Sequence, residues 1–272
     1  MDKQLLTAFL LGVVQGVAEF LPISSSGHLV LGETLLRRWT GISAGNPSAT
    51  GGLFFNVALH LATLLAILVV YRAELRELPR RRRLVGMIVL ASVPAAVVGL
   101  TLKDWFETAF QTPEVAGIGL LVTSVLLVAG QRWETRRDGL QDLTWQQALL
   151  VGMFQAAALV PGISRSGSTI AAGLLAGLRR EAATTFSFLI AIPAIGGAAL
   201  LESLDHVRQG GAGAAGGRPD WQALGIGMAA AFLFGLLSLR WLIGLVNRGR
   251  LARFACYTAA VGALTLVLCG VS

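Results

Sequence analysis

Six long apolar runs constrain the fold of this chain more than any other feature of its sequence. They cover residues 53–71, 84–102, 115–131, 183–201, 221–245 and 252–271. A helix rises about 1.5 Å per residue, so a run of roughly twenty residues can cross the ~30 Å hydrocarbon core of a bilayer. Only 14% of the residues are charged, against about 25% in soluble domains. The sequence therefore predicts an all-α polytopic membrane protein that forms a single integral membrane domain over residues 1–272.

Two further apolar segments, near the start and the middle of the chain, are copies of one another. At a constant offset of 140, nine of the twenty positions from 8 to 27 carry the same residue as their partners. In each copy a polar tip interrupts the apolar helix: residues 20–28 read FLPISSSGH and residues 160–168 read VPGISRSGS. We interpret each copy as a re-entrant helical hairpin, because irregular backbone is tolerated at membrane depth only where protein surrounds it.

The order of hairpins and spans predicts the symmetry of the fold. The arms of the first hairpin are expected at residues 5–21 and 29–37, and those of the second at 145–160 and 168–178. A hairpin returns the chain to its starting side, and the three spans that follow leave it on the opposite side. We therefore expect two inverted-topology repeats, about 1–138 and 139–272, each a re-entrant helical hairpin followed by three transmembrane helices. Such repeats place a site at their interface near the bilayer midplane.

The net charge of +7 does not indicate binding to nucleic acid, because the basic residues lie in short loops between spans. Fourteen Lys and Arg residues fall in the loops 72–83, 131–144, 179–182 and 246–253. Loops rich in Lys and Arg face the cytoplasm. This face is therefore predicted to be cytoplasmic and both chain ends to lie outside. The first hairpin would then enter the membrane from outside and the second from the cytoplasm.

Two charged residues stand out inside the hairpins, Glu19 in the first copy and Arg165 in the second. A charge at the bilayer centre costs about 2.5–3.5 kcal/mol even on permissive insertion scales. Each is therefore expected to face a polar cavity and to have a partner. A structural ion pair that locks the two copies together is one interpretation, and a reaction site is the other.

The residues around this pair have the composition of a phosphate cradle. The tips supply hydroxyls and flexible backbone N–H donors from Ser24, Ser25, Ser26, Gly27, Ser164, Ser166 and Gly167. Helix N-termini, expected near His28 and Ser168, would add a positive dipole, and an arginine fork binds oxyanions through two hydrogen bonds.

His28 adds a group that can react. It could act as a general acid–base or accept a phosphoryl group, while a serine oxygen could be the nucleophile. Glu19 could orient a base or hold a divalent cation against the phosphates. A capping or packing role is the alternative for His28. For His60, which lies in a span, we favour a structural role.

The two motifs, Gln15-x-x-x-Glu19 continuing to His28 and Pro161 to Ile170, resemble those of the undecaprenyl-diphosphate phosphatase family, also called bacitracin-resistance proteins. The resemblance implies a multi-pass enzyme of the bacterial inner membrane. Such an enzyme hydrolyses undecaprenyl diphosphate to undecaprenyl phosphate and inorganic phosphate, which recycles the lipid carrier for cell-wall synthesis and confers bacitracin resistance. It also implies a site on the periplasmic side, and a homodimer is a possible assembly.

By position, the resemblance implies a site core and a set of supporting ligands. The core is Glu19, Ser25, His28, Ser164 and Arg165. The supporting phosphate ligands that it implies are Ser24, Ser26, Ser166 and Thr169. We add Gln15, Gly27 and Gly167 as further expected phosphate-binding residues. We favour Ser25 as nucleophile, His28 as its proton partner and Arg165 as the phosphoryl clamp, with His28 or an activated water as the other candidate nucleophiles.

The resemblance also implies a divalent cation, Mg²⁺ or Ca²⁺. Gln15 occupies a position that is acidic in some family members, so Glu19 is the one carboxylate expected at the site. A polyprenyl-phosphate flippase is the alternative function, because inverted repeats with broken helices are a transporter architecture. A flippase would bind the head group between the tips without cleaving it.

Overall fold

The computed structural model describes residues 3–28, 30, 53–208 and 220–270. Within these ranges the regular structure is entirely helical, which confirms the predicted all-α class. The helices are α1 (Lys3–Phe20), α3 (Leu53–Val70), α4 (Arg72–Glu77), α5 (Arg82–Thr101), α6 (Lys103–Ala109), α7 (Pro113–Arg132), α8 (Trp145–Ala157), α9 (Arg165–Leu175), α10 (Arg180–Arg208), α11 (Trp221–Asn247) and α12 (Arg253–Gly270), with 3-10 turns η1 (Leu78–Arg80) and η2 (Leu140–Asp142). The second arm of the first hairpin falls largely outside the described residues.

Several of these helices are long and apolar enough to cross a bilayer. In the described part of the chain, four single helices are long and apolar enough: Arg82–Thr101, Pro113–Arg132, Arg180–Leu204 and Trp221–Asn247. A fifth candidate joins Phe55–Val70 to Arg72–Arg80 across a bend of 73°. The stretches Gln4–Phe20 and Arg253–Cys269 are apolar but shorter. Four of the six predicted spans are thus long enough by themselves, the span at 53–71 is long enough only together with the bent segment that follows it, and the sixth forms the shorter α12. The helices are those of a multi-pass membrane protein.

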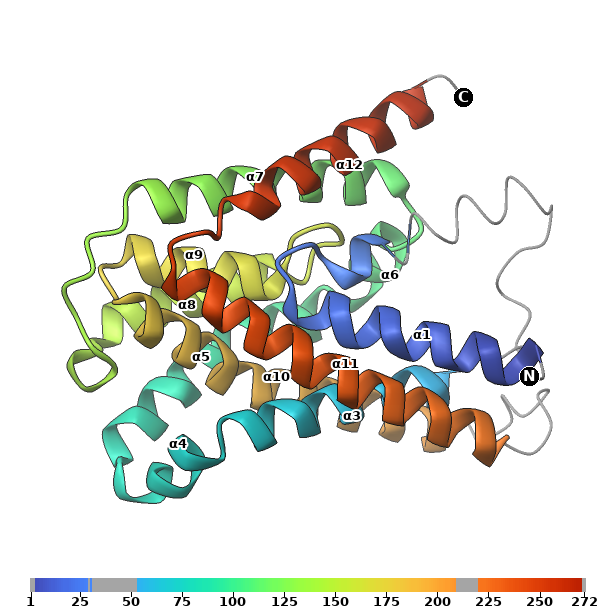
Figure 1. The fold of residues 1–272 in the computed structure, drawn as a ribbon, viewed down its shortest axis with the longest axis horizontal. Helices are drawn as coiled ribbons and strands as arrows, with labels where there is room; N and C mark the ends of the chain where they lie inside the picture. Colours follow the sequence, from blue (N-terminus) through green and yellow to red (C-terminus); the bar gives the residue numbers. More distant parts are fainter. Residues whose placement is uncertain (1–2, 29, 31–52, 209–219, 271–272) are drawn as a thin grey trace.

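Helices far apart in the sequence pack side by side (Figure 1). The first hairpin helix, α1, lies along α11, and the corresponding helix of the second hairpin, α8, lies along α5. Small residues allow these approaches: a Cβ on Gly12 would overlap the carbonyl oxygen of Gly227, and one on Gly152 would lie 2.5 Å from that of Ala91. Close packing of this kind is how helices associate in membranes.

The most enclosed helix is α9, which begins at the second polar tip. Every residue from Ser166 to Leu174 is buried, because α7, α8 and α10 all pack against it. The polar residues at its start are therefore surrounded by protein, as irregular backbone at membrane depth requires.

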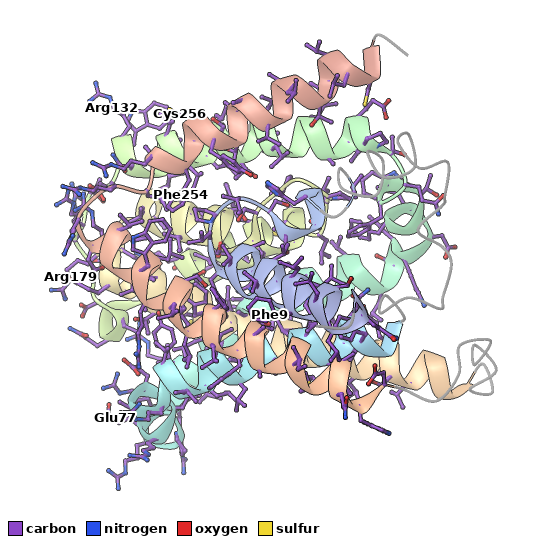
Figure 2. The ribbon with its side chains drawn as sticks, turned by 45° about the vertical axis from the view of Figure 1, so that its right-hand side comes forward. Phe9, Glu77, Arg132, Arg179, Phe254 and Cys256 are labelled. Carbon is purple, nitrogen blue, oxygen red and sulfur yellow. The ribbon has the colours of Figure 1, made fainter. Side chains whose placement is uncertain are left out.

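The arginine-rich loops gather at one end of the molecule, where Figure 2 places Arg132 and Arg179. There Arg180 at the start of α10 donates from Nε to Glu134 Oε2 at 2.8 Å and from Nη1 to the carbonyl of Asn247 at 3.1 Å. Burial alone would raise the pKa of Glu134, but hydrogen bonds and charges from Arg180 and Arg136 outweigh burial and lower it. This cluster ties the loop after α7 to α10 and α11.

Candidate active site

The two polar tips touch each other in a reciprocal way. A Cβ added to Gly27 would lie 3.0 Å from Gly162 Cα, and one added to Gly167 would lie 3.0 Å from Pro22 Cβ. Gly27 and Gly167 are 140 positions apart, and so are Pro22 and Gly162. The same contact is therefore made twice, once by each copy of the repeated segment.

Both tips begin their second helix with a capping serine. The Ser24 hydroxyl accepts a hydrogen bond from the Gly27 N–H at 3.2 Å, and the Ser164 hydroxyl accepts one from the Gly167 N–H at 3.2 Å. Helical backbone consequently starts at residues 25 and 165. The prediction of helix starts near residues 28 and 168 was wrong by three residues, because a capping serine accepts from the third residue of its helix.

The caps differ in backbone conformation. Ser24 has φ 64°, whereas Ser164 is extended with φ −72° and ψ 121°. A left-handed conformation is uncommon for a residue other than glycine and costs on the order of 1–3 kcal/mol. Such strain clusters at functional sites, and here it marks the first tip.

Glu19 and Arg165 form the predicted ion pair between the two tips. Arg165 Nη2 donates to Glu19 Oε1 at 2.6 Å, and the side chains are 16% and 9% exposed. The guanidinium also lies over the Phe188 ring, 5.9 Å from its centroid. Arg165 Nη1 is buried and has no hydrogen-bond partner in the described ranges. Of the two terminal nitrogens of the guanidinium, one is thus held by Glu19 and the other is enclosed without a partner among the described residues.

The second carboxylate oxygen of Glu19 has two neighbours. Gln15 Nε2 donates to Oε2 at 3.2 Å, and His60 Nε2 lies 3.9 Å from the same oxygen. In the second copy Leu159 takes the place of Glu19. The counterpart of Gln15 there, Gln155, is buried, and neither atom of its amide has a partner in the part of the chain described.

Unused donors remain at both tips. Among the described residues, the backbone N–H groups of Ser25 and Ser26, and those of Arg165 and Ser166, make no hydrogen bond. These are the free N–H groups of helix N-termini, which bind phosphate readily. The Ser25 hydroxyl likewise has no partner within the described residues, whereas the Ser26 and Ser166 hydroxyls lie 3.2 and 3.3 Å from those of the capping serines.

Both ring nitrogens of His28 are engaged. Nδ1 lies 2.8 Å from the carbonyl oxygen of Ser24, and a carbonyl only accepts, so Nδ1 carries a proton. Nε2 lies 2.7 Å from the hydroxyl of Tyr257 on α12. No hydrogen bond joins His28 to Ser25 among the described residues. The sequence reasoning did not single out Tyr257, because a lone aromatic in an apolar span has no local signal.

A second residue that the sequence reasoning missed fixes the second tip. Thr123, fully buried on α7, donates to the carbonyl of Gly162 at 2.9 Å and accepts from the N–H of Ser164 at 2.9 Å. By contrast, Thr169 lies one turn inside α9, where its hydroxyl bonds to the Arg165 carbonyl and to Ser187. The Thr169 hydroxyl therefore does not lie with the backbone N–H groups of Arg165 and Ser166 that have no partner among the described residues.

The tips offer a single carboxylate to a divalent cation. No group of three or more His, Cys, Asp or Glu side chains that could hold a metal occurs in the described part of the chain. Mg²⁺, however, is often held by one or two carboxylates together with substrate phosphates. Glu19 supplies the one carboxylate of the two tips among the described residues, and its Oε2 accepts from the Gln15 amide with His60 Nε2 3.9 Å away.

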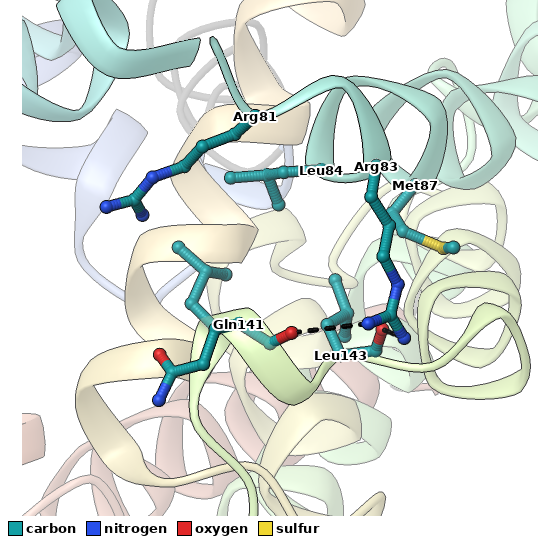
Figure 3. A pocket seen from close by; sticks show the side chains of 7 residues that line it. Arg81, Arg83, Leu84, Met87, Gln141 and Leu143 are labelled. Carbon is teal, nitrogen blue, oxygen red and sulfur yellow. Dashed lines mark hydrogen bonds between the residues drawn. The ribbon is translucent and has the colours of Figure 1, made fainter.

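A separate cavity of about 350 Å³ lies at the arginine-rich end and includes no residue of the tips. Figure 3 shows Arg83 between η2 and the start of α5, where it donates to the carbonyl of Leu143 at 3.0 Å. Leu84 and Met87 form part of the apolar lining. The lining of this cavity includes neither the N-terminal residues of the two tip helices nor Glu19.

Comparison with known proteins extends over almost the whole chain. The family model described as bacitracin resistance protein BacA matches residues 8–264. A protein of Rhodopirellula baltica named undecaprenyl-diphosphatase is 41% identical over 98% of both chains. Undecaprenyl-diphosphatase 3 of Bacillus cereus is 39% identical over 97% of this chain and 96% of its own. The chain therefore belongs to the bacitracin resistance protein BacA family.

Proposed function

We propose that this protein is an undecaprenyl-diphosphate phosphatase, which hydrolyses undecaprenyl diphosphate to undecaprenyl phosphate and inorganic phosphate. The observation that carries the proposal is the arrangement of Arg165. One nitrogen of its guanidinium is held by Glu19, and the other is buried without a partner in the described ranges, beside two helix N-termini with free N–H groups. Recycling of the lipid carrier and bacitracin resistance follow from this activity.

In this proposal the two tips bind the diphosphate from both sides. The free N–H groups of residues 25, 26, 165 and 166 and the unpaired nitrogen of Arg165 donate to phosphate oxygens. Charge on these oxygens grows during phosphoryl transfer, so donors held in place beforehand stabilise the transition state most. Ser24 and Ser164 position the donors by capping the helices.

We favour Ser25 as the nucleophile because its hydroxyl has no other partner among the described residues. Its oxygen would bond to the terminal phosphorus as the bridging P–O bond breaks and undecaprenyl phosphate leaves. Both ring nitrogens of His28 are engaged, so the hydroxyl proton would reach His28 Nε2 through the Tyr257 hydroxyl that contacts this nitrogen. Water would then hydrolyse the phosphoserine to release phosphate. An attack by His28, or by a water that His28 activates, is the alternative.

A Mg²⁺ or Ca²⁺ ion is part of the proposal. Glu19 would hold it together with substrate oxygens, since the tips offer one carboxylate. When bound, such an ion neutralises charge on the diphosphate. Gln15 keeps the carboxylate of Glu19 oriented through its hydrogen bond to Oε2.

The reciprocal contacts of the two tips support an inverted-repeat architecture. Helix α1 packs on α11 as α8 packs on α5, and α5 and α11 begin about 140 positions apart. The tips show the same symmetry, because Gly27 contacts Gly162 as Gly167 contacts Pro22. In this arrangement the first copy supplies Glu19, Ser25 and His28 and the second supplies Arg165.

The orientation we propose places the arginine-rich end in the cytoplasm. The exposed side chains of Trp133 and Trp145 lie near that end of α7 and α8, as expected of aromatic residues at a membrane interface. The membrane would be the bacterial inner membrane and the site would open to the periplasm. A homodimer remains a prediction.

Phosphate release in detergent tests the proposal against a flippase. Hydrolysis needs no sealed bilayer, whereas transport does. Purified protein in micelles is expected to release phosphate from undecaprenyl diphosphate. Absence of release in micelles, with movement of the lipid across sealed vesicles, would favour the flippase and contradict the phosphatase.

A further inference from the structure

We propose that Tyr257 is a positioning residue of the reaction site, which holds His28 through Nε2 and keeps that nitrogen ready to accept a proton. The inference rests on the proposed phosphatase function. Tyr257 Oη lies 2.7 Å from His28 Nε2, the ring planes are within 3° of parallel, and their centroids are 5.6 Å apart. The residues are 229 positions apart, so the contact is tertiary.

The protonation of His28 follows from its other neighbour. The Ser24 carbonyl, 2.8 Å from Nδ1, can only accept a hydrogen bond, so Nδ1 carries a proton in both the neutral and the charged ring. A neutral His28 therefore has its lone pair on Nε2. Any proton that His28 takes up must arrive at Nε2, and because the Tyr257 hydroxyl already occupies the lone pair of that atom, the proton is handed over by Tyr257.

A phenol suits this position because it can both donate and accept. It donates to Nε2 while His28 is neutral. As it gives that proton to Nε2 it takes up the proton that the nucleophile loses, so it is a phenol again and accepts from Nε2–H. The hydrogen bond reverses its direction and the ring stays in place. The bond thus fixes the ring in both states of a general acid–base cycle, which phenylalanine cannot do.

The second repeated segment has no such pair. Ser168 stands 140 positions after His28, and Gly117 stands 140 positions before Tyr257. The Ser168 hydroxyl donates to the carbonyl of Ser164 at 2.7 Å, so it bonds within its own tip. Both members of the His–Tyr pair are thus changed at the equivalent positions, and within the described residues the hydrogen bond from a tip side chain to a side chain of the last helix is made by the first tip.

A purely structural explanation is that His28 only provides a hydrogen-bond partner for the Tyr257 hydroxyl and thereby helps to hold α12 in place. The two explanations differ in how the variants combine. If Tyr257 acts through His28, removing the Tyr257 hydroxyl lowers kcat only while His28 is present. If it only stabilises α12, its removal has the same effect whether or not His28 is present.

The test is a double-mutant cycle of Tyr257→Phe and His28→Gln in full-length protein, measured as phosphate release from undecaprenyl diphosphate in detergent. Tyr257→Phe is expected to lower kcat by roughly 3- to 10-fold, the value of one hydrogen bond, with little change in KM. Adding it to His28→Gln should lower kcat no further. Thr258→Val is the matched control, since the Thr258 hydroxyl bonds only to its own helix.

A second readout does not depend on activity. The chain has two tyrosines, so a ¹³Cζ-tyrosine label gives two NMR signals, which Tyr71→Phe and Tyr257→Phe assign. His28→Gln is expected to shift the Tyr257 signal and to leave that of Tyr71 in place. Wild-type kcat in Tyr257→Phe, or equal losses in both backgrounds, would overturn the inference. If wild-type protein itself releases no phosphate, the proposed function fails instead, and the NMR result still decides whether the contact exists.

Discussion

Arg165 Nη2 donates to Glu19 Oε1 at 2.6 Å across 146 positions of sequence, and this bond joins the two polar tips. Each charge is largely enclosed, so each would be costly without the other. Among the described residues Arg165 Nη1 has no partner, and Glu19 Oε2 accepts from Gln15 and lies 3.9 Å from His60 Nε2. The pair therefore joins the tips, as the structural interpretation expects, and a role in ligand binding remains the proposal that the variants below test.

The capping serine of the second tip is expected to matter for activity beyond its effect on stability. Ser164→Ala removes the acceptor for the Gly167 N–H and should cost about 1 kcal/mol of stability. It should also lower phosphate release, because the donors of α9 lose their position. The measurements are thermal unfolding and phosphate release in detergent.

Thr144→Ala is the matched control for this variant. Thr144 caps α8 by accepting from the Gln147 N–H at 3.3 Å, at the opposite end of the same hairpin. A similar loss of stability is expected, with activity retained. Equal activity of the two variants would show that the cap of α9 has no special role in the reaction.

The turn at Gly162 is expected to tolerate no side chain. Gly162 has φ +90°, and a Cβ there would overlap the carbonyl oxygen of Ala116 on α7. Gly162→Ala should lower the stability by about 1–3 kcal/mol, visible as a lower thermal midpoint. Gly86→Ala serves as the control, because nothing lies within 4 Å of its added Cβ, and its midpoint should be unchanged or slightly higher. Equal midpoints would contradict the packing described at the tip.

The sequence predicted the tips and their pairing because those signals are local. Glu19 and Arg165 are charges in apolar segments, and a charge in such a place needs a partner. Tyr257 and Thr123 carry no such signal: a hydroxyl in a span is common, and its partner is set by how α12 and α7 pack on the tips. The helix starts were misplaced because the serines were considered as ligands, whereas Ser24 and Ser164 act first as caps.

His60 shows the same limit of local reasoning. Its position in an apolar span favoured a structural role, and its Nδ1 does bond to the carbonyl of Asn56 at 2.9 Å. Only the packing of α3 near α1 reveals that Nε2 lies 3.9 Å from Glu19.

The second arm of the first hairpin, predicted over 29–37, lies largely outside the described residues.

Glu134 is expected to make stability depend on pH at the arginine-rich end. Its pKa is lowered below the ordinary value of 4.5, so it contributes stability above about pH 4.5 that is lost as the pH falls through the lowered value. Glu134→Gln should lower stability at pH 7 by about 1.5–3 kcal/mol, the value of hydrogen bonds to a charged group. The difference from wild type should shrink below pH 4.5 in thermal unfolding curves.

The control for Glu134 is Glu77→Gln. Glu77 pairs with Arg81, but both side chains are about half exposed, and exposed ion pairs contribute little. Its unfolding curve should follow that of wild type at every pH. A constant deficit of Glu134→Gln across the pH range would refute the role assigned to its carboxylate.

Removal of divalent cations is expected to abolish activity without unfolding the protein. Treatment with EDTA should lower phosphate release by on the order of 100-fold and leave the thermal midpoint unchanged, because the proposed ion is shared with the substrate. Added Mg²⁺ or Ca²⁺ should restore release in wild type but not in Glu19→Gln. Full activity in EDTA would contradict the proposal that a divalent cation takes part in the reaction.

Phosphate release by Arg165 variants tests the central claim most directly. Purified wild type, Arg165→Ala and Arg165→Lys would be compared on undecaprenyl diphosphate in detergent, with thermal unfolding to show that each is folded. Arg165→Ala should lose about 10³-fold or more. Arg165→Lys keeps a cation opposite Glu19 but lacks the planar fork, so it should recover only part of the rate. Wild-type rates in folded Arg165→Ala would contradict the site proposed at the two tips.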